Sequence, residues 1–153
     1  MHFLENRIPP PVVMMVFGVI MWGLSKFDQL LMLEATLQLS LLVSFIAAGA
    51  IIALVAMVNF RLAKTTVNPL QPDQASTLVV SGVFRYSRNP MYLALVFFLI
   101  AFALYLSSLW ASLGIVGFIL YINVFQIKPE ERILTARFGQ AYLDYCDRVR
   151  RWI

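Results

Sequence analysis

The chain has little charge, one cysteine and one histidine, and each shortage excludes a class of protein. Only 13% of its 153 residues are charged, whereas a soluble domain carries about 25%. Cys146 and His2 are too few for an internal disulfide, and they make a metal site built from such side chains improbable. Because 61% of the residues are hydrophobic, we expect a single integral membrane domain over residues 1–153, with no metal.

Four apolar runs predict an all-α membrane helical bundle with about four transmembrane helices. They cover residues 10–24, 35–60, 90–106 and 110–127. Crossing the hydrocarbon takes about 20 apolar residues. The first run is short, but no small-residue cleavage site follows it, so we interpret it as a retained helix rather than a signal peptide. The gap at Ser107-Ser108-Leu109 is short enough only for a tight helical hairpin.

The remaining segments predict a long loop and a helix that lies on the membrane. Residues 61–89 have no sustained apolar period and contain turn-forming residues, so we expect a cytoplasmic loop. Residues 129–150 have apolar side chains at spacings of three and four, which predicts a C-terminal interfacial amphipathic helix. Gly139 would be its weak point, because glycine costs a helix about 1 kcal/mol relative to alanine.

The basic residues are distributed unevenly between the two sides of the expected bundle. One side holds only Lys26, and the other holds Arg7, Arg61, Lys64, Arg85, Arg88, Lys128, Arg132, Arg137, Arg148, Arg150 and Arg151. Cytoplasmic loops of membrane proteins carry the excess of lysine and arginine. We therefore expect a bacterial inner-membrane protein with both termini and the loop 61–89 in the cytoplasm.

The polar chemistry is concentrated in residues 82–92, directly before the third apolar run. Asn89-Pro90 predicts a helix start, because asparagine caps backbone N–H groups and proline at the first position loses no needed donor. Such a helix directs the positive end of its dipole, together with Arg85 and Arg88, toward the cytoplasm. This arrangement suits an anionic ligand at the membrane surface.

The order of several motifs resembles a known family. Residues 81–92, then a helical hairpin, then Glu130-Glu131, then residues 138–145 (Phe-Gly-Gln-Ala-Tyr-Leu-Asp-Tyr) resemble the isoprenylcysteine carboxyl methyltransferases. The related phospholipid N-methyltransferases are similar over the same region. The resemblance covers about half of the chain, from about residue 65 to residue 149, and its specificity comes from the order and spacing of the motifs.

The resemblance implies a membrane methyltransferase that uses S-adenosylmethionine as its cofactor. A lipophilic substrate, carrying a prenyl group or a lipid, would reach the methyl group from the bilayer. The catalytic residues implied are Arg88 and Glu131. The cofactor-binding residues implied are Gly82, Val83, Tyr86, Asn89, Pro90, Tyr92, Glu130 and Glu131. Asn89 replaces the family's histidine, and its amide can position a cofactor but cannot transfer a proton.

The chemistry depends on the nucleophile, which the sequence leaves open. A substrate carboxylate is already charged and needs no base, so Arg88 would hold one oxygen while the other attacks. A lipid amine must lose a proton, which Glu130 or Glu131 could accept. Either acid could instead bind the ammonium or ribose hydroxyls of the cofactor. Backbone N–H groups near Gly82 and Pro90 could bind the cofactor's carboxylate.

Each of these residues also has an ordinary structural explanation. Glu130 and Glu131 follow a proline, where acids commonly complement a helix dipole. Arg85 and Arg88 could serve only as charges flanking a span, and Tyr86 and Tyr92 as aromatic residues of the membrane interface. Asn89 could be a plain helix cap.

Two other function classes remain open. A small four-span transporter or scaffold would have a basic rim, but a transporter would be expected to bury an ionisable residue within a span, and residues 35–60, 90–106 and 110–127 contain none. A membrane reductase using reduced nicotinamide is the third class, because sterol reductases resemble this family in their C-terminal half. We expect contacts with membrane lipids and none with nucleic acid; the sequence leaves the oligomeric state open.

Overall fold

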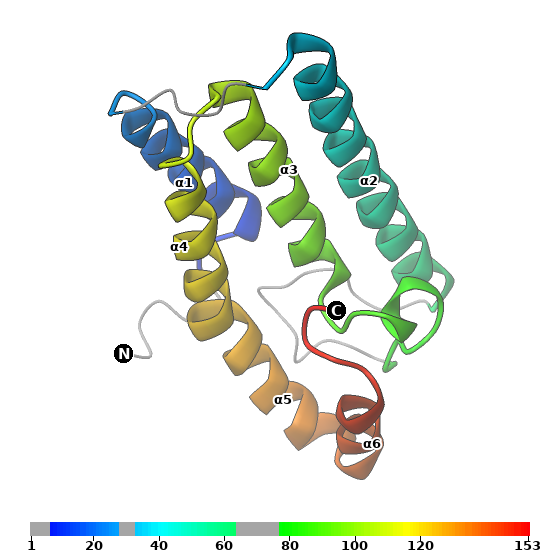
Figure 1. Ribbon diagram of the computed structural model, residues 1–153. Coiled ribbons are helices and arrows are strands. Elements are labelled where there is room, and N and C mark those ends of the chain that lie inside the picture. The colour runs from blue at the N-terminus through cyan, green and yellow to red at the C-terminus, as the bar shows by residue number, and fades with distance from the viewer. Residues whose placement is uncertain (1–6, 28–32, 64–76) are drawn as a thin grey trace.

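The protein is a bundle of helices with a smaller helical cap at one end (Figure 1). The computed structural model describes residues 7–27, 33–63 and 77–153, and every regular element in these ranges is helical. In chain order the elements are α1 (Pro10–Leu24), α2 (Ala35–Leu62), the 3₁₀ helix η3 (Gly82–Arg85), α3 (Pro90–Leu106), α4 (Ser112–Ile122), the π-helix η4 (Asn123–Ile127), α5 (Lys128–Phe138) and α6 (Gln140–Arg148).

The lengths of the helices support a membrane protein. Within the described ranges, α2 and the continuous helix Ser112–Phe138 are long and apolar enough to cross a bilayer. The apolar helices α1 and α3 have 15 and 17 residues and are shorter than such a span. A helical membrane protein is therefore supported, while the expected number of four spans stays a prediction.

The main core lies where α1, α3 and α4 meet. Met21 of α1 and Phe118 and Ile122 of α4 are fully buried there. Gly114 of α4 allows this approach, because a Cβ atom at that position would collide with the Met21 side chain. On the other side of α3, a Cβ on Gly49 of α2 would meet the Phe98 ring. Small residues thus let α1 and α2 pack closely against α4 and α3.

The hairpin between α3 and α4 lies at the end of the bundle away from the cap. Ser107 ends α3 in a left-handed conformation with φ of 52°. The Ser108 Oγ accepts the Ala111 N–H at 3.2 Å. Gln38 of α2 donates to the Leu104 carbonyl at 2.6 Å and to the Ser107 hydroxyl at 2.8 Å. These contacts satisfy polar groups exposed where α3 ends.

The expected loop 61–89 is partly helical. α2 continues to Leu62, and residues 64–76 lie outside the described part of the chain. Val79 and Phe84 pack with Ala56 and Phe60 of α2. This packing fixes η3 against the end of α2.

The C-terminal region contains two helices rather than one. The expected single helix over residues 129–150 is wrong, because Gly139 adopts φ of 53° and separates α5 from α6. Glycine takes this conformation without the steric penalty that other residues incur. α5 continues the line of α4 beyond the bundle, and α6 returns toward the start of α3 (Figure 1). Tyr142 and Tyr145 of α6 are buried in a cluster with Leu134 and Phe138 of α5.

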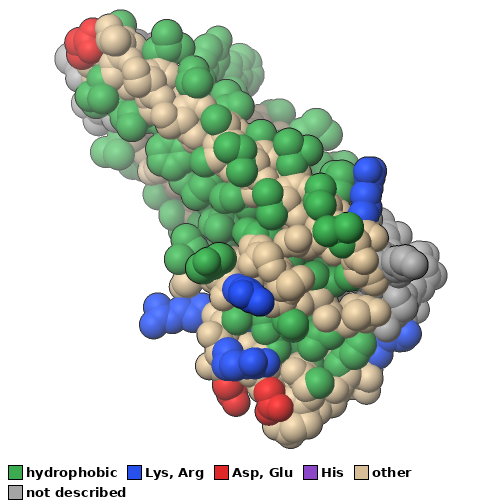
Figure 2. Space-filling model, turned by 90° about the vertical axis from the view of Figure 1, so that its right-hand side faces the viewer, with side chains coloured by type: hydrophobic (Ala, Val, Ile, Leu, Met, Phe, Trp, Pro, Cys, Tyr) green, Lys and Arg blue, Asp and Glu red, His purple; other side chains and the backbone are tan. Residues whose placement is uncertain are grey.

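The surface separates an apolar part from a charged part. Figure 2 shows hydrophobic side chains over the upper length of the visible face, with most lysine and arginine side chains toward the lower end. The exposed apolar residues of α2 include Leu39, Val43, Ile46, Leu54 and Val58. A contiguous apolar surface of this kind is suited to lipid.

Candidate active site

A corner at the start of α3 is the first component of the site. Asn89 occupies the position before the helix, with Pro90 at its first residue. The prediction that Asn89 caps this helix is wrong, because its side chain makes no hydrogen bond to the backbone N–H groups of the first turn. Its Nδ2 instead donates to the Arg151 carbonyl at 2.9 Å, and its backbone N–H donates to the Ser87 Oγ at 3.1 Å. Asn89 therefore binds the C-terminal segment to the start of α3.

Arg88 points from this corner toward α5. Its Nη2 lies 3.2 Å from the Oε1 of Glu131, and its side chain is 14% exposed. Its Nη1 donates to the Sγ of Cys146 on α6. Its backbone N–H donates to the Arg150 carbonyl at 3.0 Å. The corner is thus joined by side-chain and backbone contacts to α5, to α6 and to the end of the chain.

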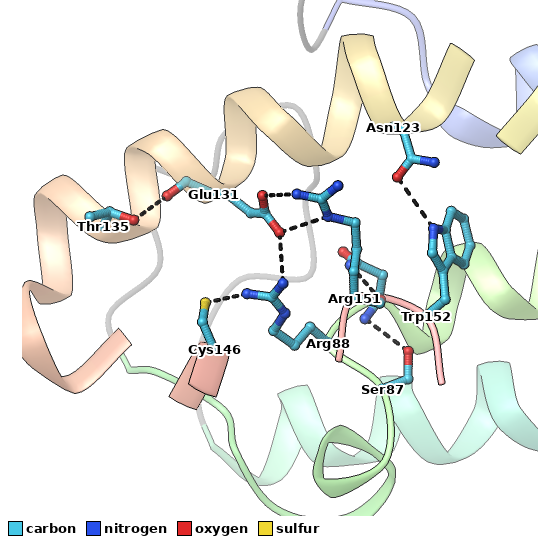
Figure 3. A network of polar contacts seen from close by, with 9 residues as sticks. Ser87, Arg88, Asn123, Glu131, Thr135, Cys146, Arg151 and Trp152 are labelled. Atoms are coloured by element: carbon cyan, nitrogen blue, oxygen red, sulfur yellow. Dashed lines mark hydrogen bonds and ion pairs between the residues drawn. The ribbon is translucent and has the colours of Figure 1, made fainter. Parts of the chain in front are cut away.

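Glu131 lies between two arginines (Figure 3). Arg151 binds its carboxylate with two atoms, Nε at 3.0 Å from Oε1 and Nη2 at 2.7 Å from Oε2. Such paired contacts between guanidinium and carboxylate are stronger and more directional than single ones. Arg88, Glu131 and Arg151 therefore form one ion-pair cluster at the charged end of the bundle.

A second polar pair adjoins this cluster. The Tyr92 hydroxyl on α3 donates to the Oε1 of Glu130 on α5. Tyr92 is buried. The start of α3 and the first turn of α5 are therefore linked twice, once by Arg88 and Glu131 and once by Tyr92 and Glu130. Sequence reasoning had grouped these four residues, and the structure brings them together at one end of the bundle.

α6 and the segment after it are anchored at two further places. The Tyr145 hydroxyl on α6 donates to the Phe84 carbonyl of η3 at 2.7 Å. The Trp152 Nε1, beyond α6, donates to the Asn123 Oδ1 in the π-helix at 3.3 Å. The C-terminal region is therefore held at η3 and at η4.

Burial and hydrogen bonding fix the charge states in this region. Burial raises the pKa of Tyr142 and of Tyr145 well above the ordinary value for tyrosine. The hydrogen bonds from Arg151 to Glu131 raise the pKa of the Arg151 guanidinium. Both tyrosines are thus neutral and Arg151 is charged at physiological pH.

Three of the expected cofactor-binding residues lie apart from the ion-pair contacts. Gly82 has φ of 60° and sits beside Asn59 of α2. Val83 packs in the cluster formed with the end of α2. Tyr86 is 76% exposed. A fourth expected residue, Pro90, follows Asn89 and is buried at the start of α3.

The sequence does not reveal two of the side chains that contact the predicted catalytic residues, Arg151 in the cluster and Cys146 beside Arg88. It assigns Arg151 only to the basic rim and gives Cys146 no role. The sequence holds one weak signal for Arg151. The apolar residues Val149 and Trp152 flank it beyond the last amphipathic helix, which indicates that this segment packs against the protein. Cys146 has no such signal, because its partner Arg88 is 58 residues away in the chain.

An apolar groove runs along α1 and the distal half of α3. Its volume is about 550 Å³, and its lining includes Met14, Gly18, Trp22, Phe98 and Phe102. α3 leads from the ion-pair cluster at its first turn to this groove. At 1.5 Å per residue, Phe98 is about 9 Å along the helix from Tyr92.

Comparison with known proteins identifies the family. A family model described as phospholipid methyltransferase matches residues 37–141. An uncharacterized protein of Haemophilus influenzae is 48% identical over 63 residues, which are 41% of this chain and the whole of that protein. No solved structure matches significantly. The region matched by the family model holds α3, the first turn of α5 and the four residues of the two links between them, and the chain belongs to the phospholipid methyltransferase family.

Proposed function

We propose that this protein transfers the methyl group of S-adenosylmethionine to a lipophilic substrate at the cytoplasmic membrane interface. The family points to a membrane methyltransferase, and its members typically use this cofactor. We propose an isoprenylcysteine-type carboxylate as the substrate class. The observation that carries the proposal is the cluster in which Arg88 of the α3 corner meets Glu131 of α5 at 3.2 Å.

The residues present fit the polar end of the cofactor. Its amino-acid part bears an ammonium and a carboxylate, and the cluster offers a carboxylate and two guanidinium groups. When bound, the cofactor supplies a sulfonium methyl group, which passes to the nucleophile while the electron pair of the broken bond stays on sulfur. A carboxylate substrate needs no proton removed, so the protein's task is to position it.

The roles follow from the contacts. Arg88 would hold one oxygen of the substrate carboxylate, because its guanidinium lies at the start of α3 beside Glu131. Glu131 would accept a hydrogen bond from the cofactor. Tyr92 and Glu130 brace α3 against α5, which keeps the distance between these groups constant. The groove along α1 and α3 would take the prenyl chain.

One observation favours a lipid amine as the second candidate substrate. The half-buried carboxyl of Glu130 already accepts a hydrogen bond from Tyr92. Such a carboxyl could accept the proton that an amine must lose before it is methylated. The family description names phospholipid as the substrate of its members, which supports the same alternative.

Two measurements test the proposal. Calorimetric titration of the purified protein in detergent should show binding of S-adenosylhomocysteine and none of reduced nicotinamide dinucleotide. The opposite result would favour a reductase, and binding of neither would favour a transporter or scaffold. Membrane extracts incubated with labelled cofactor should then yield a labelled lipophilic product, and mass spectrometry would distinguish a methyl ester from an N-methyl amine.

A further inference from the structure

The apolar groove along α1 and α3 ends beside a cation at the hairpin end of the bundle. Met21, near the end of α1, packs against Gly114, near the start of α4, so the last turn of α1 lies at this end. Trp22 in this turn lines the groove. The Lys26 Nζ lies 4.7 Å from the centre of the Trp22 ring. The groove therefore carries a positive charge at the end that is distant from the ion-pair cluster.

The length of the groove matches one half of a bilayer. Its lining on α1 runs from Met14 to Trp22, and at 1.5 Å per residue this is about 12 Å. The hydrocarbon core of a membrane is about 30 Å thick, so one leaflet contributes about 15 Å. Tryptophan is enriched where hydrocarbon meets the head groups, and Trp22 at that level places Met14 near the middle of the membrane. The groove is thus long enough for most of one acyl tail in the leaflet away from the cap.

The groove is open toward the membrane along α1. Met15, Val19 and Trp22 line it, and these residues are 60%, 68% and 54% exposed. Gly18 lies among them, and a Cβ atom there would meet only the Phe102 ring, at 3.9 Å. There is consequently room above Gly18, and a lipid chain can enter the groove sideways from the bilayer.

The charge at the hairpin end favours a phosphate. The Lys26 side chain is exposed, and a lysine ammonium is a compact point charge with three donors that commonly binds phosphate. Its contact with the Trp22 ring holds this charge beside the groove. Glu34, an acid at the same end, accepts the N–H groups of Thr36 and Leu37 with its two carboxylate oxygens, so its carboxylate is engaged within its own helix.

We propose that the groove and Lys26 form a binding site for a phospholipid of the leaflet away from the cap, with one acyl tail in the groove and the phosphate on the Lys26 ammonium. The head group of this lipid lies at the opposite end of the bundle from Arg88 and Glu131, so the lipid is not the methyl acceptor and the site does not depend on the proposed function. An acyl tail bound here and the proposed prenyl chain would fill the same groove, so the two ligands exclude each other.

The test compares two lipids that share both tails and differ in the phosphate-bearing head group. The full chain, purified in a detergent without phosphate, is titrated with palmitoyl-oleoyl phosphatidylglycerol or with palmitoyl-oleoyl glycerol, and the first bound lipid is measured by native mass spectrometry. The wild type should bind phosphatidylglycerol about fivefold more tightly, which is the effect of one basic side chain on an anionic lipid. Equal affinities for the two lipids would overturn the proposal.

Lys26→Ala tests the phosphate contact. It should weaken phosphatidylglycerol about fivefold and leave the Kd of the diacylglycerol within about twofold. Lys128→Ala is the matched control, because it removes the same charge from the start of α5, at the cap end, and it should change neither Kd. Equal losses of phosphatidylglycerol binding in the two variants would show that only the net charge matters, and the site would be rejected.

Gly18→Leu tests the tail contact. The added side chain occupies the room above Gly18 without meeting backbone, and it should weaken both lipids at least about tenfold, because exposing two methylene groups already costs that much. Gly23→Leu adds the same atoms to α1 outside the groove, where a Cβ atom meets nothing within 4 Å, and both lipids should bind as in the wild type. Unchanged binding to Gly18→Leu would overturn the proposal. Lys26→Ala alters an exposed side chain and decides the matter even if Gly18→Leu misfolds.

Discussion

The two ends of the bundle are held together by different kinds of contact. At the hairpin end, Gln38 bonds to the Leu104 carbonyl and the Ser107 hydroxyl, and Glu34 caps its own helix through the N–H groups of Thr36 and Leu37. At the other end, Arg88, Glu131 and Arg151 are charged and come from three separate parts of the chain. The contacts at the hairpin end satisfy polar groups at helix termini, whereas the other end brings three charged side chains together.

This difference indicates where chemistry is possible. Contacts that complete a helix end use the polar groups that make them and leave little capacity for a ligand. Removing charged groups from water costs free energy even when they are paired, so a partly buried cluster of three charged side chains is maintained at a cost that a purely structural end would avoid. Four substitutions test this contrast, three of them with a counterpart elsewhere in the molecule.

Glu131→Gln should have the largest effect. It removes the negative charge and leaves two guanidinium groups facing each other, so we expect methyl transfer to fall by at least about 10³. Glu34→Gln, at the hairpin end, should leave turnover unchanged. Both are measured by incorporation of labelled methyl groups, with membrane insertion checked by fractionation. Full activity of Glu131→Gln would show that this acid has no catalytic role.

Arg88→Ala should reduce turnover somewhat less, by about 10². Glu131 keeps its paired contact with Arg151 in this variant, so part of the cluster survives. Arg85→Ala is the counterpart three residues earlier, where the side chain is exposed, and we expect nearly normal rates. Equal losses in the two variants would mean that Arg88 contributes only through the general positive charge of this surface.

Tyr92→Phe should act on stability. Without the hydroxyl, the half-buried Glu130 carboxyl loses its donor, which should lower the free energy of unfolding by about 1 kcal/mol. Tyr105, at the hairpin end of α3, is 68% exposed. Tyr105→Phe should therefore change the free energy of unfolding by less than about 0.5 kcal/mol. Thermal unfolding in micelles, followed by circular dichroism, compares the two. Similar midpoints would contradict a bracing role for the Tyr92–Glu130 pair.

Gln38→Leu should have the smallest effect. Hydrogen bonds between helices in membranes contribute about 0.6 kcal/mol on average, and this substitution loses the contacts with Leu104 and Ser107. We expect a small decrease in unfolding temperature in the same assay and unchanged turnover. A large loss of activity would show that the hairpin end influences the site.

Local sequence signals predicted the helices well. Prolines start α1 and α3 at Pro10 and Pro90, and the gap after Leu106 forms the expected tight hairpin. These features depend on neighbouring residues, so the sequence contains the information. The sequence marks Gly139 as a possible break in one helix over residues 129–150, and the structure shows the break there. Whether a glycine bends or breaks a helix depends on what the second part packs against, here the cluster around Tyr142 and Tyr145.

The site could be predicted only in part, for a related reason. The order of motifs indicated that Arg88 and Glu131 belong together. The partner of Asn89 could not be predicted, because the Arg151 carbonyl is 62 residues away and any backbone carbonyl looks the same in a sequence. Gly82 and Val83 share a motif with Arg88, yet the 3₁₀ helix carries them to the end of α2. Neighbours in a motif need not be neighbours in space.

The π-helical turn at residues 123–127 determines which way α5 faces. A π turn amounts to one additional residue in an α-helix, and each residue rotates the following part by about 100°. The turn absorbs that residue, so α4 and α5 stay in phase across it. If the same residues were wound as an ordinary α-helix, with none removed, the acids of α5 would rotate to a different azimuth and would face lipid or solvent instead of their partners. The orientation of the acidic pair is therefore set by the winding of the backbone at η4 as much as by residue type.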